Sequence, residues 1–272
     1  MIELDFNLVG QSGPRAADTL RRLLVPRILE RLPQAELVIL YGSAARGELT
    51  ADSDIDVMVF LPKKQLQQIG ADFGQLADEV WGRTPVDLGV PFPLELLFAD
   101  EAWNNDFLLY ALHEALPLHD PRGLLAGRQR VLAKWPPEVR RQKTVFVGRK
   151  IIDWLARLEQ RVRKRDQLGA AAIRAKIIKY NLILLHLRQN QFWVASNLYY
   201  SAKRLPGSER FLASADRCVA NLLSDRADDY LGQLTKQIQE EIIQAGLLPQ
   251  NFFANYRPWR QPLRYRISEN LL

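Results

Sequence analysis

The stretch from residue 37 to residue 60 constrains the fold and chemistry of this chain more than any other. An apolar run, Leu37–Leu40, is followed by Gly42 and Ser43, a spacer of small and polar residues, and then Asp54-Ile55-Asp56 at the start of a second apolar run. Short apolar runs bounded by turn residues indicate buried strands. Because side chains alternate along an extended strand, Asp54 and Asp56 are expected on the same side of it.

Two carboxylates held this closely repel each other unless a cation lies between them. Oxygen-only ligands suit Mg²⁺, which proteins typically hold through one or two carboxylates together with substrate phosphates. Gly42 and Ser43 are expected at a strand-to-helix turn, where backbone N–H groups can bind phosphate. The stretch therefore predicts a site for Mg²⁺ and a phosphorylated substrate.

The Gly-Ser pair, followed after a polar spacer by Asp-x-Asp, resembles the signature of the polymerase-β-type nucleotidyltransferases. The match covers roughly residues 36–90. In this family a third acidic residue on a neighbouring strand completes the metal site, and Asp87 is the matching position here. The resemblance implies that Asp54, Asp56 and Asp87 hold one or two Mg²⁺ ions and support an in-line displacement.

The resemblance also implies contacts to the nucleotide. Gly42 and Ser43 are expected to hold the β- and γ-phosphates of a nucleoside triphosphate. Arg46 either contacts phosphate or forms a salt bridge to Glu48 or Asp52.

Charge is divided unevenly along the 272 residues. Residues 1–120 carry 9 Lys and Arg against 19 Asp and Glu, a formal charge of −10, whereas residues 121–272 carry 28 against 12, a charge of +16. This sign change predicts a domain boundary near residue 120. The resemblance implies a nucleotidyltransferase domain at 1–120, and a helical bundle domain with a basic, aromatic tail is expected at 121–272. The acidic half suits a divalent cation and the basic half suits phosphate, although attraction between the two halves also explains the pattern.

Two lysines of the basic half are candidate nucleotide contacts. Lys176 and Lys179 lie one turn apart on a predicted helix, from which they could reach the triphosphate. The alternative is an ordinary solvated helix face.

Hydrophobic periodicity predicts an α+β fold, in which a small mixed β-sheet domain is followed by an all-α helical bundle. After an extended lead-in over 1–15, the strands are expected at 36–41, 54–61, 86–90 and 116–120. The helices are expected at 16–32, 64–81, 101–115, 121–134, 139–167, 170–189, 192–205, 208–223 and 228–244. The tail from Pro249 onward is expected to pack as an irregular arm.

Cysteine usage and hydropathy set further limits. The single cysteine, Cys218, excludes an internal disulfide framework and fits a reducing compartment. No stretch approaches the ~20 apolar residues of a membrane span. A cytoplasmic protein without a membrane partner is therefore expected.

The motif and its family resemblance together predict an enzyme that transfers a nucleoside monophosphate to a hydroxyl of a small-molecule or protein acceptor and releases pyrophosphate. The expected donor is ATP, and the expected transferred group is AMP. Asp87 or Glu95 is the candidate general base. The helical half is loosely similar to that of aminoglycoside and lincosamide nucleotidyltransferases, but its charge disfavours a polycationic acceptor. The acceptor and the oligomeric state stay open.

Two other functions are compatible with the sequence. The first is a non-catalytic nucleotide-binding or antitoxin-like regulatory module, which the intact acidic set disfavours. The second is nucleotide addition to nucleic-acid 3′ ends, suggested by the basic half and the Arg/Trp/Tyr tail, although no RNA-binding module is recognisable.

Overall fold

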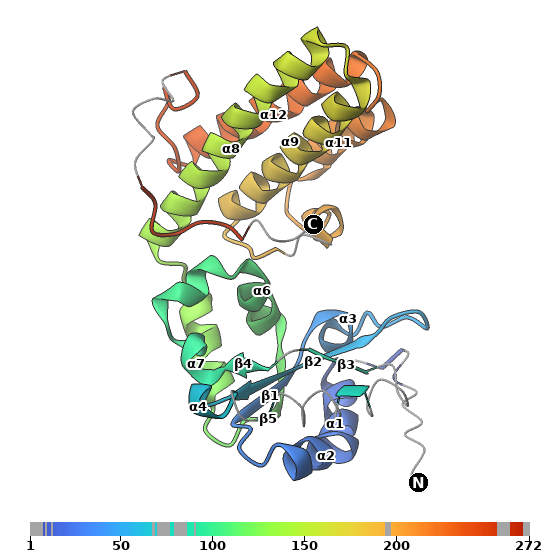
Figure 1. The fold of residues 1–272 in the computed structure, drawn as a ribbon, viewed down its shortest axis with the longest axis vertical. Helices are drawn as coiled ribbons and strands as arrows, with labels where there is room; N and C mark the ends of the chain where they lie inside the picture. The colour runs from blue at the N-terminus through green and yellow to red at the C-terminus, as the bar shows by residue number, and fades with distance from the viewer. Residues whose placement is uncertain are drawn as a thin grey trace. The chain divides into compact units, whose positions relative to one another are not determined.

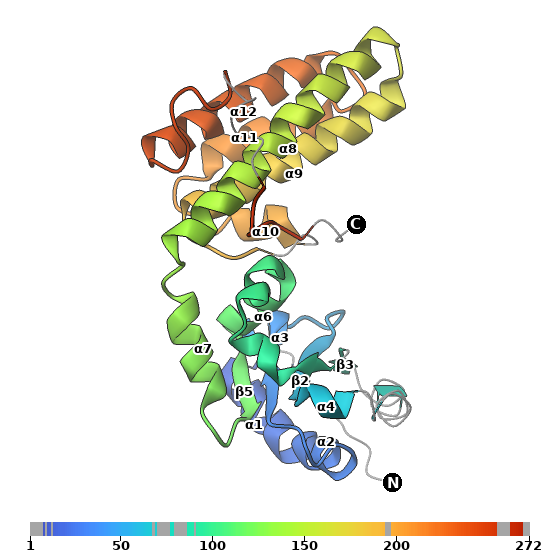
Figure 2. The same cartoon turned by 60° about the vertical axis from the view of Figure 1, so that its left-hand side comes forward.

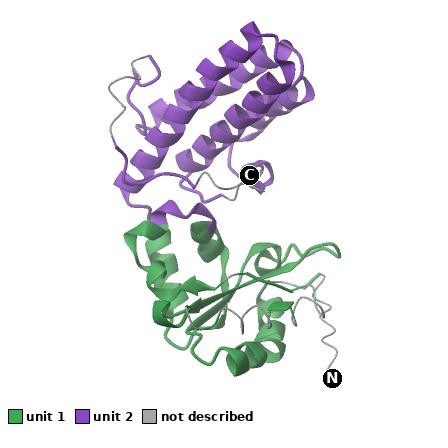
Figure 3. Cartoon of the chain, in the orientation of Figure 1, with its two compact units in different colours: residues 1–102, 108–134 green, residues 103–107, 135–272 purple. Residues whose placement is uncertain are grey.

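The chain forms two compact units, shown in different colours in Figure 3. The computed structural model describes residues 8, 10, 11, 13–66, 69, 77, 78, 86–89, 91–193, 197–254 and 262–268. Unit 1 comprises Met1–Ala102 and Leu108–Lys134, and unit 2 comprises Trp103–Phe107 and Trp135–Leu272. Residues 121–134 thus group with unit 1, whereas the charge pattern placed them in the helical half. The domain boundary near residue 120 stays a prediction.

Unit 1 is built around a small mixed sheet. Its described strands are β1 (Leu37–Leu40), β2 (Ile55–Leu61), β3 (Val86–Leu88), β4 (Phe92–Pro93) and β5 (Leu116–His119). Their order is β3-β2-β1-β5, with β4 also beside β2. β1 runs antiparallel to β2 and β5, whereas β3 and β4 pair in parallel with β2. The predicted α+β class with a small mixed sheet is confirmed.

Helices α1 and α2 lie on one side of this sheet (Figures 1 and 2). The helices that begin before residue 135 are α1 (Gly13–Leu23), α2 (Val25–Arg31), α3 (Gly42–Arg46), α4 (Lys63–Leu66), α6 (Asp106–Glu114) and α7 (Leu124–Leu132), with 3₁₀ turns η1 (Leu94–Leu97) and η2 (Asp100–Asn104). The prediction of one continuous helix over 16–32 was wrong, because the chain breaks at Leu24. Pro26 explains the break, since proline is accepted in the first turn of a helix but not in its interior.

Strand alternation separates the core from the polar side of the sheet. Val57 and Val59 of β2, with Val86 and Leu88 of β3, belong to the buried cluster that includes the apolar side chains of α1 and α2. The intervening residue Asp56 therefore points to the opposite side of the sheet.

Unit 2 is a helical bundle. Its helices are α8 (Pro137–Arg163), α9 (Gln167–Arg188), α10 (Leu198–Ala202), α11 (Glu209–Ala220) and α12 (Arg226–Gln244). The four long helices α8, α9, α11 and α12 lie side by side in both views (Figures 1 and 2). Cys218 is buried, as the sequence indicated. No helix of the described part combines the length and apolar character needed to traverse a lipid bilayer.

Further helix predictions differ from the structure or lie beyond it. The segment expected as one helix over 101–115 is divided into η2 and α6. Among the described residues of the helix expected over 192–205, only Leu198–Ala202 is α-helical. Phe192 and Trp193 instead stack on Trp135, with ring centroids 4.6 and 6.2 Å apart, so that packing decides the backbone there. Most of the helix expected over 64–81 lies outside the described residues.

The segment 262–268 is irregular, as expected for the tail, and it is tied to unit 2 by a buried ion pair. The ammonium of Lys143 is fully buried, lies 2.6 Å from the carboxylate of Asp106 and donates to the carbonyl of Arg266 at 3.0 Å. The other carboxylate oxygen of Asp106 accepts from the backbone N–H of Ser268 at 2.7 Å. The rest of the tail, residues 255–261 and 269–272, lies outside the described residues.

Breaking this buried pair should destabilise unit 2 strongly. Asp106→Ala leaves the Lys143 ammonium buried without its counter-ion, which typically costs about 3–5 kcal/mol of unfolding free energy. Urea unfolding of the full chain measures the loss. Lys143→Met added to Asp106→Ala should restore part of it, because the uncompensated charge is gone. An exposed ion pair supplies the control: Arg163→Gln, which removes the partner of Glu159, should leave the midpoint unchanged.

Candidate metal and nucleotide site

Three carboxylates gather at one end of the parallel pair β2–β3. The residues are Asp54, Asp56 and Asp87, and each offers a carboxylate oxygen that lies within 4.8 Å of the other two. Asp56 and Asp87 face each other in the register of the pair. Asp54 lies two residues before Asp56, on the same side of the chain. The structure thus brings the three predicted metal ligands together.

Gly42 permits the approach of α3 to this cluster. Its φ of +70° is strained for any residue with a side chain, and a Cβ atom added there would lie 2.0 Å from Oδ2 of Asp56. The backbone N–H of the preceding Tyr41 donates to the carbonyl of Asp56 at 3.0 Å. The first turn of α3, with Gly42 and Ser43, is therefore held directly against the carboxylates.

The carboxylates carry an electrostatic cost when no cation is bound. Burial, followed by the charges of Asp54 and Asp87, raises the pKa of Asp56 to about 7. An oxygen-only set of three closely spaced carboxylates with this mutual repulsion fits a hard divalent cation such as Mg²⁺. The donor chemistry and the geometry therefore agree with the predicted metal.

Tyr41 is a member of the site that sequence reasoning missed. Its side chain is 7% exposed. Burial, and then the charges of Asp56, Asp87 and Asp54, raise the pKa of its phenol well above the usual range. The phenol therefore stays protonated beside the cluster. Its position directly before Gly42 was the available signal.

Arg46 is engaged by acidic residues. Its Nε donates to Glu48 at 2.8 Å, and its Nη1 donates to Glu114 at 2.7 Å and to the hydroxyl of Tyr110 at 2.8 Å. The salt bridge to Glu48 is one of the alternatives that the sequence left open. Glu114 lies 68 residues away in α6, and no local pattern pointed to it.

Glu95 lies apart from this cluster. It lies in η1 and accepts from the backbone N–H of Lys63 at 3.0 Å. η1 directly follows β4, and β4 pairs with Phe60 and Leu61, at the end of β2 opposite to Asp56. A strand rises about 3.3 Å per residue, so Glu95 is too far from Asp56 to act as its neighbour. Lys176 and Lys179 lie on α9 in unit 2, and their contact with a nucleotide stays a prediction.

Substituting Gly42 should disrupt the carboxylate cluster. Gly42→Ala combines a strained φ with a clash against Asp56, so we expect Mn²⁺ binding to weaken at least tenfold and stability to fall by roughly 1–3 kcal/mol. Gly123→Ala is the matched control, because Gly123 has φ +65° but nothing within 4 Å of the added atom. That variant should lose stability without losing Mn²⁺ affinity, as measured by calorimetry. Equal Mn²⁺ affinities in the two variants would contradict the assigned contact.

The raised pKa of Asp56 predicts a pH effect on the metal-free protein. Its folded value of about 7 lies above the ordinary 3.8, so folded Asp56 retains a proton that the unfolded chain loses in this window. The contribution of Asp56 to the free energy of unfolding therefore falls as pH rises from about 4 to about 7. Urea midpoints measured in EDTA should show this slope in the wild type and in Asp52→Asn, and a flatter slope in Asp56→Asn. A slope that survives Asp56→Asn would show that another group is responsible.

Comparison with known proteins gives a family match over the region that contains the site. Residues 22–110 match the family of the nucleotidyltransferase domain. No curated protein sequence matches the chain. Among solved structures, the chain is similar to a nucleotidyltransferase-like protein from Exiguobacterium sibiricum 255-15, at 11% identity and a TM-score of 0.47, over 85% of this chain and 77% of that one.

The matched region contains the five motif residues of the site, Gly42, Ser43, Asp54, Asp56 and Asp87. The family match and the expected motif thus fall on the same elements, α3, β2 and β3. Residues 22–110 of this chain thus match a nucleotidyltransferase domain, which is consistent with the polymerase-β type that the motif resembles.

Proposed function

We propose that this protein is a Mg²⁺-dependent enzyme that transfers AMP from ATP to a hydroxyl of an acceptor and releases pyrophosphate. The observation that carries the proposal is the cluster of three carboxylates within 4.8 Å of one another in a nucleotidyltransferase domain. A degenerate copy of the fold that binds no cation would have no electrostatic reason to keep three like charges together.

Asp54, Asp56 and Asp87 would hold the metal. Mg²⁺ bound there supplies charge neutralisation for the triphosphate and lowers the pKa of the attacking hydroxyl. The chain contributes the fixed spacing of its carboxylates, which the register of β2 with β3 imposes. Such preorganised groups need no rearrangement when charge develops in the transition state.

Gly42 and Ser43 would position the nucleotide. They are the first two residues of α3, and the first N–H groups of a helix lack intrahelical acceptors. Those groups are therefore suited to phosphate oxygens beside the metal ligands. Arg46 would add positive charge near the phosphates while its ion pairs with Glu48 and Glu114 hold α3 in place.

Asp87 would accept the proton of the acceptor. Of the two candidate bases, only Asp87 belongs to the carboxylate cluster. In the proposed step the acceptor oxygen bonds to the α-phosphorus, the bond from that phosphorus to the pyrophosphate oxygen breaks, and the hydroxyl proton moves to a carboxylate oxygen of Asp87.

The positive charge of the helical half limits which kinds of acceptor the enzyme is expected to bind. Residues 121–272 carry a formal charge of +16, which disfavours a polycation and favours a neutral or anionic small molecule or a protein hydroxyl. Lys176 and Lys179 are proposed as further contacts to the triphosphate, and a cytoplasmic location belongs to the same proposal.

Neutralising one carboxylate should abolish transfer. We expect Asp54→Asn and Asp87→Asn to lower the rate of label transfer from α-labelled ATP to the acceptor by about 10²–10³-fold, as loss of one preorganised electrostatic group commonly does. Asp52→Asn is the matched control, because Asp52 is exposed and lies two residues from Asp54 outside the cluster. An acceptor panel of metabolites and proteins, followed by the position of the label, identifies the product.

The same variants also test whether the protein binds the nucleotide without transferring AMP. A rise of the thermal midpoint with Mg²⁺ and ATP, absent in Asp54→Asn, shows that the native state binds the nucleotide. That rise without label transfer to any acceptor would favour a regulatory module. No rise with any nucleoside triphosphate, and wild-type behaviour of Asp54→Asn, would refute the enzyme assignment.

A further inference from the structure

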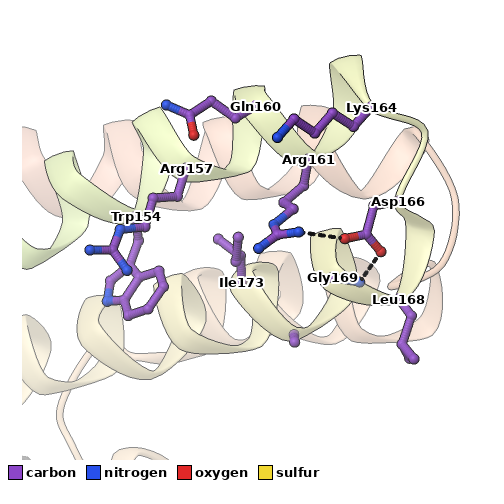
Figure 4. Close-up of a pocket in the computed structure, with 10 residues that line it drawn as sticks. Trp154, Arg157, Gln160, Arg161, Lys164, Asp166, Leu168, Gly169 and Ile173 are labelled. Carbon is purple, nitrogen blue, oxygen red and sulfur yellow. Dashed lines mark hydrogen bonds and ion pairs between the residues drawn. The ribbon is translucent and has the colours of Figure 1, made fainter.

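A second candidate site lies entirely within unit 2, in a groove between α8 and α9. The groove has a volume of about 600 Å³, which lies within the range of small-molecule sites. Trp154, Arg157, Arg161 and Lys164 line it from α8 and the turn that follows, and Figure 4 shows them above α9. None of the carboxylates of the nucleotidyltransferase domain takes part.

Positive charge in this groove exceeds the negative charge available to balance it. Arg161 pairs with Asp166 at 2.9 Å, and the same carboxylate accepts from the backbone N–H of Gly169. Both carboxylate oxygens of Asp166 are therefore engaged within the protein. Arg157 and Lys164 form no ion pair with any residue that the structure describes. The groove thus presents at least two cations that lack a protein counter-ion.

Trp154 holds part of this charge in place. The guanidinium of Arg157 lies 4.7 Å from the centroid of the Trp154 ring, and the ammonium of Lys176 lies 4.5 Å from it. Stacking on an aromatic face orders a long cationic side chain without neutralising it. Figure 4 shows Arg157 beside the ring at the edge of the groove. An ordered, uncompensated guanidinium is suited to a tetrahedral oxyanion.

The helix dipole does not explain the cations. A cation at the C-terminus of a helix is stabilised by the dipole, and this accounts for Lys164, which follows the last residue of α8. Arg157 lies six residues before that end, and the dipole effect falls off within the last turn. The dipole therefore does not account for Arg157, whose exposed guanidinium is available to a bound anion.

The other wall of the groove is apolar. Leu168 is 78% exposed, and Ala172 and Ile173 follow it along α9. An apolar surface beside uncompensated cations suits a ligand that carries an anionic group on an organic body. A phosphate ester has this combination, with two negative charges for the cations and an apolar part for Leu168.

We infer that the groove between α8 and α9 binds a soluble organic phosphate, with its phosphate at Arg157 and Lys164 and its organic part against Leu168. Trp154 acts as a positioning residue for Arg157. The site is independent of the metal, and its occupant need not be the nucleotide that the other unit binds.

Calorimetry with AMP tests this inference in the full chain. The background variant is Asp54→Asn and the buffer contains EDTA, so that metal-dependent binding is removed. AMP should bind, inorganic phosphate should bind more weakly, and adenosine should not bind. Arg157→Gln and Lys164→Gln should each weaken AMP binding about tenfold, a typical loss for a hydrogen bond to a charged group.

Matched control variants distinguish binding at the groove from general attraction of the phosphate to the positive charge of unit 2. Arg217→Gln on α11 and Lys236→Gln on α12 remove the same exposed charges from unit 2 without lining the groove. These controls should retain AMP affinity. Trp154→Leu should weaken binding as much as Arg157→Gln, with no further loss in the double variant, whereas Trp154→Phe should recover part of it because it keeps an aromatic face. Urea midpoints verify that each variant is folded.

Three results would overturn the inference. One is the absence of binding by both AMP and inorganic phosphate up to about 10 mM, well above a millimolar dissociation constant. Another is an equal loss of affinity in the groove variants and in the controls. The third is tighter binding of a single-stranded oligonucleotide than of AMP with a steep salt dependence, which would assign the surface to nucleic acid.

Discussion

Asp56 and Asp87 stand side by side because β2 and β3 run parallel and in register, and the remainder of unit 1 keeps two like charges in that position. The opposite side of the same strands is buried against α1 and α2. A shift of one residue in the pairing would turn the carboxylates into this core and the apolar side chains out of it. The hydrophobic core thus specifies the geometry of the charged site.

Much of this arrangement could be predicted from sequence because it depends on local periodicity. Alternation along β2 places Asp54 and Asp56 on one side, and the family resemblance pointed to Asp87, an isolated charge within the apolar stretch Val86–Leu88, as the third carboxylate. The partner of Arg46 could not be found in this way, since Glu114 lies in a helix 68 residues away and several acidic residues were available. The break at Leu24 was missed because apolar spacing continues across it, although Pro26 was visible in the sequence.

The number of basic residues overstates the cations that unit 2 offers to ligands. The guanidinium of Arg174 is 2% exposed and forms two hydrogen bonds to the carboxylate of Asp228, at 2.7 and 2.9 Å. Arg188 and Arg210 both form ion pairs with Glu241, and Lys143 forms an ion pair with Asp106. Several basic side chains of unit 2 therefore belong to internal pairs that orient helices. Charge that is left without a partner, as at Arg157, says more about binding than the sum over a domain.

The buried pair of Asp106 and Lys143 also bears on the order in which the chain becomes structured during synthesis. Asp106 accepts from Ser268, 162 residues further along the chain, so the polar groups around it are completed only when the C-terminal segment has left the ribosome. Domains generally fold in the order in which they emerge. The strands of unit 1 need only residues up to His119, whereas Trp103–Phe107 must wait until the segment around Ser268 has been translated. A segment far along the chain thus completes the fold of one that was translated much earlier.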